Sequence, residues 1–235
     1  MIRSLSFIAM LCLFMANASA QKFDIPMVTC SGKKVAYLTL NDGTQVEGLM
    51  KDLGFKKGLI DKMKFEPVDG NKVKLKHSSI KHMYLPPSGI EKLGKTLEFA
   101  HDAQMWKSRD VDQEIINKGY VYYEQTDVLI KKKKVKLMMQ LLNSSFSDGI
   151  KIYNDPFANE TASVGVAGIT VAGGDAKSYY IKKGNGTAYR LYKKNYDKEF
   201  DKVFSDCPKL KSDPTAGKWS SIETHVHTYA TDCAK

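Results

Sequence analysis

The stretch Val35-Ala-Tyr-Leu-Thr-Leu-Asn-Asp-Gly-Thr44 predicts an antiparallel β-hairpin. Its first six residues include β-branched and aromatic side chains, which favour a pleated strand. Asn41-Asp42-Gly43 then supplies residue types that accept the backbone conformations of a tight turn. The chain returns as a second strand from Thr44 to Met50. We therefore expect a fold based on antiparallel β-structure.

Three more strands are expected before the chain reaches Pro86-Pro87, which ends the run because proline lacks a backbone donor. In order, the predicted elements are a Lys-rich loop at Asp52–Gly58 and strands at Leu59–Glu66, Val73–Leu75 and Ser79–Leu85. Lysines alternate with apolar residues in the first two of these strands, which is typical of a sheet with one solvated face. We predict that residues 21–87 form a small β-meander or half-open barrel.

A helical connector is predicted over residues 88–118. Ser88 and Glu91 have the spacing of a capping box, so a helix is expected from Gly89 towards Trp106. A short helix or turn should then end at Gly119.

A second antiparallel β region begins after the connector. The strand candidates are Val121–Ile130, Val135–Leu142, Gly149–Tyr153, Ala176–Lys182 and Thr187–Lys193. The last two flank Gly184-Asn185-Gly186, a turn that predicts a hairpin.

Two helices are expected at the C-terminal end. Asn195 is placed to cap the first helix, in which Tyr196, Phe200, Val203 and Phe204 share one face. The second is predicted from a capping box at Ser220 and Glu223 and from one apolar stripe, formed by Trp219, Ile222, Val226, Tyr229 and Cys233. The predicted class is α+β, with these helices packed on the β region of residues 119–235.

The first 20 residues have the composition of a cleavable signal peptide. Arg3 provides a positive charge, Leu5–Met15 is almost wholly apolar, and Ala18-Ser19-Ala20 has the small residues that signal peptidase requires. The apolar run is too short to span a bilayer, so no transmembrane anchor is expected. We predict an exported protein, located in the periplasm, outside the cell or on its surface.

Export makes a disulfide plausible. Cys30, Cys207 and Cys233 follow the predicted cleavage site, and three cysteines cannot all pair within one chain. A bond between Cys207 and Cys233 would staple the C-terminal helices. A bond from Cys30 to either of them is the alternative.

The net charge of +10 favours an anionic partner, and export argues against nucleic acid. Lys131, Lys132, Lys133 and Lys134 form the densest basic run. They are interpreted either as a solvated hairpin tip or as a docking site for lipopolysaccharide or acidic polysaccharide. Tyr179, Tyr189 and Arg190 place aromatic beside basic side chains, a combination that binds sugars but also serves as cross-strand packing.

No nucleophile motif is recognisable, and no catalytic residue, cofactor or metal site is predicted. His225 and His227 lie about 200° apart on a helix, so they cannot share a metal ion, and we expect both to be exposed. A hydrolase would need the fold to bring together two carboxylates, for example among Glu124, Asp127 and Asp155.

Two segments resemble exported proteins of the Bacteroidetes. The first runs through Leu40-Asn-Asp-Gly-Thr44, Glu47-Gly48, Lys64-Phe-Glu66, Asp69-Gly70 and Ser78-Ser-Ile-Lys-His-Met-Tyr84, and is similar to their small N-terminal β modules. The second, Tyr189-Arg-Leu-Tyr-Lys-Lys-Asn-Tyr-Asp-Lys-Glu-Phe200 with Phe204-Ser-Asp-Cys-Pro208, is similar to the end of uncharacterised secreted proteins of that phylum. The resemblance implies a periplasmic or cell-surface location and identifies no functional residue.

The sequence therefore favours a non-enzymatic binding or envelope-associated module. Its expected partner is an anionic envelope polymer or another envelope protein. The two alternatives are a hydrolase of envelope or extracellular polymers and an electrostatic binder of anionic glycans or lipid headgroups that uses the Lys131–Lys134 run.

Overall fold

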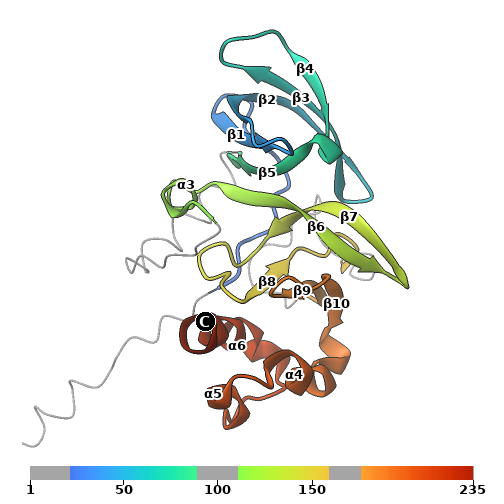
Figure 1. The fold of residues 1–235 in the computed structure, drawn as a ribbon, viewed down its shortest axis with the longest axis vertical. Coiled ribbons are helices and arrows are strands. Elements are labelled where there is room, and N and C mark those ends of the chain that lie inside the picture. Colours follow the sequence, from blue (N-terminus) through green and yellow to red (C-terminus); the bar gives the residue numbers. More distant parts are fainter. Residues whose placement is uncertain (1–21, 89–110, 159–175, 235) are drawn as a thin grey trace, which may run out of the picture.

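A computed structural model describes residues 22–88, 111–158 and 176–234, which form one ten-stranded sheet, with the helices that follow β10 gathered at one end (Figure 1). The strands are β1 (Val35–Leu40), β2 (Gln45–Lys56), β3 (Leu59–Pro67), β4 (Val73–Lys76), β5 (Ile80–Leu85), β6 (Val121–Ile130), β7 (Lys133–Leu141), β8 (Ile150–Tyr153), β9 (Ser178–Lys183) and β10 (Tyr189–Tyr192). Their spatial order is β10-β9-β8-β7-β6-β5-β1-β2-β3-β4. The predicted signal peptide and the predicted helix towards Trp106 lie outside the described residues.

The helices are short. They are η2 (His77–Ser79), α3 (Gln113–Asn117), η5 (Lys193–Asn195), α4 (Tyr196–Phe204), α5 (Pro208–Lys211), η6 (Trp219–Ser221), α6 (Ile222–Thr228) and the π-helical turn η7 (Tyr229–Cys233). None of the helices in the described ranges combines the length and the apolar composition needed to cross a membrane.

Both predicted β regions belong to the same sheet, because β5 pairs with β6 from His82↔Glu124 to Leu85↔Val121. The predicted β-rich α+β class is confirmed, although the sheet does not close into a barrel. The strands Val35–Leu40 and Val121–Ile130 have the predicted bounds.

The predicted loop at Asp52–Gly58 is wrong, because β2 continues to Lys56 and only Lys57 and Gly58 make the turn. Both turn residues have positive φ, 53° and 73°. A Cβ on Gly58 would lie 2.5 Å from the Cβ of Pro156, so this position also requires glycine for space. The β2–β3 turn thus packs against the segment that follows β8.

Two of the three buried clusters of the described residues, which we call the first and the second core, lie on opposite faces of β6 and β7. The first core takes Tyr123 and Met138 from these strands and is otherwise formed mainly by β1, β2, β3 and β5. The second takes Tyr122 and Met139. A parallel bridge joins Val128, in the second core, to Ala188, the residue before β10.

The C-terminal helices pack on β8, β9 and β10, as predicted. Their buried residues, including Phe200 and Val226, form one cluster with Ile152, Ile181 and Leu191 of the strands. A disulfide of Cys207 with Cys233 joins α5 to the end of η7, which confirms the predicted pairing, and Cys30 takes no part in it.

Neither predicted C-terminal cap forms in the expected way. Asn195 is the first flanking residue of α4, but its side chain makes no capping hydrogen bond. Ser221 rather than Ser220 precedes α6. Glu223 is not free to cap that helix through its Oε1, because this atom accepts a hydrogen bond from the backbone N–H of Phe23 at 3.0 Å.

The connection from β7 to β8 is braced by Asn143, whose side chain is fully buried. Its amide nitrogen donates to the carbonyl oxygens of Phe146 (3.0 Å) and Ile150 (2.8 Å). Its Oδ1 accepts from the N–H of Ile152 at 2.8 Å. One side chain therefore satisfies three backbone groups of a buried turn.

Candidate functional site

A row of tyrosines crosses the middle of the sheet. From β1 to β9, residues directly opposite one another are Tyr37, Tyr84, Tyr122, Leu141, Tyr153 and Tyr180. Because residues in register share a face, these rings lie on the side of the second core. Glu124 of β6 and Lys151 of β8, two places along their strands from Tyr122 and Tyr153, lie on this face too.

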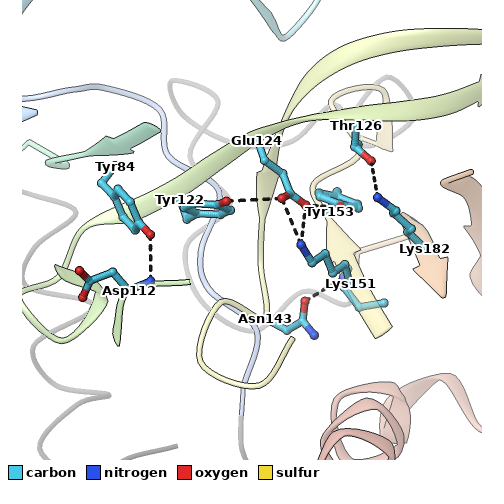
Figure 2. A network of polar contacts seen from close by, with 10 residues as sticks. Tyr84, Asp112, Tyr122, Glu124, Thr126, Asn143, Lys151, Tyr153 and Lys182 are labelled. Carbon is cyan, nitrogen blue, oxygen red and sulfur yellow. Dashed lines mark hydrogen bonds and ion pairs between the residues drawn. The ribbon is translucent and has the colours of Figure 1, made fainter. Parts of the chain in front are cut away.

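Glu124 is the centre of a polar network on this face (Figure 2). Both of its carboxylate oxygens lie 3.1 Å from the Nζ of Lys151. The hydroxyl of Tyr153 donates to Oε1 at 2.5 Å and that of Tyr122 to Oε2 at 3.4 Å. The side chains of Glu124 and Lys151 are only 13% and 15% exposed, so this ion pair is largely shielded from water.

The electrostatics keep the tyrosine protonated. Burial, with the negative charge of Glu124 beside it, raises the pKa of Tyr153 well above 10. Tyr153 is therefore a hydrogen-bond donor at any physiological pH. Each carboxylate oxygen of Glu124 already accepts two hydrogen bonds, so the group is not poised to take a proton from a substrate.

Two neighbouring contacts extend the network. The Nζ of Lys182 donates to Oγ1 of Thr126 at 3.2 Å. The hydroxyl of Tyr84 accepts from the N–H of Asp112, the residue that caps α3. These contacts tie β9 and α3 to the same face of β6 and β5.

His82 lies opposite Glu124 and packs against the rings of Tyr84 and Tyr122. Burial lowers the pKa of His82, and the positive charges of Lys81 and Lys151 act in the same direction. It is therefore a neutral ring at pH 7.

Arg190, predicted as a ligand contact, is held by Asp155 of the same fold. Its Nε lies 2.8 Å from Oδ2 of the carboxylate and its Nη2 lies 3.0 Å from Oδ1. The guanidinium also lies over the rings of Tyr180 and Tyr192, about 5.5 Å from each centroid. The contacts of Arg190 are thus largely internal.

Glu124, Asp127 and Asp155, the carboxylates that a hydrolase would need to bring together, form separate ion pairs. Their partners are Lys151, Lys134 and Arg190 respectively. Glu124 and Asp127 are an odd number of residues apart on β6, so their side chains point to opposite faces. The fold does not pair these acids.

Tyr179 and Tyr189 lie against the C-terminal helices. Tyr179 stacks on Trp219 with ring centroids 5.5 Å apart. Lys202 lies 4.6 Å above the ring of Tyr189, and burial raises the pKa of Tyr189 to about 12. Both are packing positions on the face opposite Arg190.

The Lys131–Lys134 run forms the tip of the β6–β7 hairpin. Lys131 and Lys132 make the turn, Lys131 with a φ of 57°, and the next two residues begin β7. Lys134 pairs with Asp127 at 2.9 Å. The start of β10 lies near this tip, since Ala188, the residue before Tyr189, bridges Val128, three residues before Lys131. Among the predicted ligand residues, Tyr179 and Tyr189 lie on the opposite face of β9 and β10 from Arg190.

A second basic surface, which we call the lysine face, lies on β3 and β4. Lys62 is directly opposite Lys76, and Lys64 is directly opposite Lys74. All four side chains are exposed. Asp52 approaches Lys64 at 3.4 Å, and Glu66 is shared by the flanking Lys51 and Lys72. The alternation of these lysines is visible in the sequence, but their facing arrangement depends on the strand register.

The expectation that His225 is exposed is wrong, since its side chain is fully buried. Its Nδ1 lies 2.8 Å from the hydroxyl of Tyr196 and its Nε2 lies 3.0 Å from Oγ1 of Thr215. Thr215 donates its own proton to Asp213 at 2.6 Å, so Nε2–H of His225 must be the donor to Thr215. Burial lowers the pKa of His225. His227 instead contacts the ring of Phe146, so the two histidines diverge as expected.

Within the described ranges, no group of three or more His, Cys, Asp or Glu side chains is arranged to hold a metal ion. No family model, curated protein or solved structure matches this chain.

Proposed function

We propose that the protein is a non-enzymatic binding module that is exported and recognises an anionic partner outside the cytoplasm. The lysine face is the observation that supports this proposal. Like charges placed directly opposite on a sheet are destabilising, and here two such pairs lie side by side on an exposed surface. An anionic ligand would relieve that repulsion.

The Glu124 network supports a structural rather than a catalytic role for the most shielded charges. Lys151, Tyr122 and Tyr153 satisfy the carboxylate from within the chain. A general acid or base has to keep an atom available to the reacting group, and this carboxylate is fully used.

The experiment uses protein secreted by an expressing cell, whose mass first shows whether the chain begins at Gln21. Binding is then measured to dextran sulfate and to uncharged dextran, over a range of salt concentrations. We expect binding to dextran sulfate only, and weaker binding as salt rises, because exposed charges are screened beyond the Debye length of about 10 Å at 0.1 M salt.

Equal binding to the two polymers, or binding to neither, would contradict the proposal of an anionic partner. A secreted chain that retains residues 1–20 would contradict the cleavage. Hydrolysis of an offered polymer that Glu124→Gln abolishes would contradict the non-enzymatic role.

A further inference from the structure

We infer that the lysine face binds a linear acidic polysaccharide, laid along strands β3 and β4. This inference rests on the proposed function and names the site and the class of ligand. It moves the site from the Lys131–Lys134 run to Lys62, Lys64, Lys74 and Lys76.

The arrangement of the four lysines on their strands suits an extended polymer better than a single small anion. Two residues along a strand are about 6.7 Å apart, and neighbouring strands are about 4.8 Å apart. Lys62 and Lys64 therefore form one row, with Lys76 and Lys74 as a parallel row beside it. A polymer lying along the two rows could therefore pair its successive acidic groups with successive lysines.

Protection of the sheet edge does not account for this arrangement. β4 ends the strand order, and lysines on an edge strand do prevent edge-to-edge association. Lys62 and Lys64, however, lie on β3, which is paired on both sides by β2 and β4. Lysines on β3 are therefore not needed to protect the edge. Each of them also repels the lysine directly opposite it on β4.

A lipid surface fits the lysine face less well. A membrane-binding surface combines cations with aromatic or aliphatic side chains that enter the bilayer. The exposed Val73 is in register with Phe65, whose side chain is in the first core, so Val73 lies on the opposite face from the lysines. The positions of β2 nearest to Lys62 and Lys64 are Gly54 and Asp52. The lysine face thus offers charge without an apolar anchor.

A folded protein partner is also a weaker match. Protein interfaces obtain most of their binding energy from a few buried aromatic or arginine side chains. The lysine face presents neither type in either of its two rows. A flexible, highly charged and hydrated chain needs no such anchor, because its affinity comes from many weak charge contacts.

The test compares two variants that remove the same number of charges. One is Lys62→Gln/Lys74→Gln/Lys76→Gln, on the lysine face. The matched control is Lys131→Gln/Lys132→Gln/Lys133→Gln, at the tip of the β6–β7 hairpin. Neither triple includes Lys64 or Lys134, which pair with Asp52 and Asp127. Affinity for polygalacturonate is measured by titration calorimetry with the full secreted chain.

We expect the lysine-face variant to lose about tenfold in affinity, since it loses three exposed charge contacts that each contribute modestly. The hairpin-tip control should change by less than about twofold. The midpoint of urea unfolding should stay equal or rise in the lysine-face variant, because facing positive charges are removed.

Equal losses in the two variants would overturn the inference, because net charge alone would then explain binding, while the proposed function would stand. Tighter binding of the wild-type chain to phosphatidylglycerol vesicles, or to single-stranded oligonucleotides, than to polygalacturonate would overturn the choice of ligand. If the wild-type chain bound no polyanion at all, both the inference and the proposed function would fail.

Discussion

The two ends of the sheet reach stability by different routes. The core enclosed by β1, β2, β3 and β5 consists of apolar side chains such as Leu38, Met63 and Phe65, with few hydrogen bonds to satisfy. The other end holds the buried Glu124–Lys151 pair, the buried His225 and a disulfide. An apolar core responds mainly to packing, whereas buried charges and cross-links respond to protons and reductants. We therefore expect reduction to act on the end that holds the C-terminal helices, and the protonation of buried groups to affect that end more than the apolar core.

Removal of the disulfide should have the largest effect on the stability of the C-terminal end. Cys207 and Cys233 are 26 residues apart, and closing a loop of that length stabilises a protein by about 3.5 kcal/mol in the chain-entropy model. We expect Cys207→Ser/Cys233→Ser to lower the free energy of unfolding by that order. Amide exchange measured by mass spectrometry should accelerate in α4–α6 more than in β1–β3.

The matched control is Cys30→Ser, which should lower the free energy of unfolding much less, because this partly buried side chain forms no disulfide and only packs at the edge of the first core. Equal acceleration of exchange at both ends of the sheet would show that the two ends unfold as one unit. The proposal that they are stabilised independently would then be wrong.

A smaller effect is expected from the buried ion pair. Glu124→Leu leaves Lys151 and the hydroxyl of Tyr153 without their acceptor, which should lower the free energy of unfolding by about 2 to 3 kcal/mol in urea titrations. The control is Asp127→Leu on the same strand, where the ion pair with Lys134 is exposed to solvent and contributes little to stability. Adding Lys151→Met to Glu124→Leu should restore part of the loss. A loss no greater than that of the control would mean that the network does not stabilise this end.

The smallest effect is the pH dependence from His225. Its pKa is lowered in the folded protein, so the unfolded chain binds the proton more readily. Stability should be fully present above pH 6.5, the ordinary pKa of histidine, and should fall as pH decreases towards the lowered value.

His225→Asn should reduce this slope between pH 7 and pH 5, whatever it does to stability at pH 7. His82, whose pKa is also lowered, contributes with the same sign, so His82→Asn should remove a further part. An unchanged slope in both variants would assign the pH dependence to other groups.

Much of the fold could be predicted from local patterns. The bounds of β1 and β6 followed from β-branched and aromatic runs with turn residues at their ends. Joining of the two β regions could not be predicted, because the pairing of β5 with β6 spans the connector and depends on tertiary packing. The length of β2 was missed since Gly54 and Lys56 suggested a loop, although pairing with β3 outweighs their weak strand preference.

The candidate sites were less predictable. The sequence does contain an indication that His225 is buried. It is three residues after Ile222 and four before Tyr229, which places it at the edge of the apolar stripe of α6. Glu124 lies on a strand of aromatic residues, but its partner Lys151 is 27 residues away and could not be identified without the sheet. The lysine face required the register that places Lys62 opposite Lys76.

The brace formed by Asn143 has a consequence for production of the protein. Asn143-Ser144-Ser145 is an acceptor sequence for N-linked glycans, and the nitrogen that would carry the sugar is the one that donates to Phe146 and Ile150. A glycan attached there before folding would prevent the β7–β8 connection from closing. A secretory host that glycosylates proteins would therefore yield misfolded material. A bacterial host, or Ser145→Ala in a eukaryotic one, avoids the modification and keeps the Asn143 side chain.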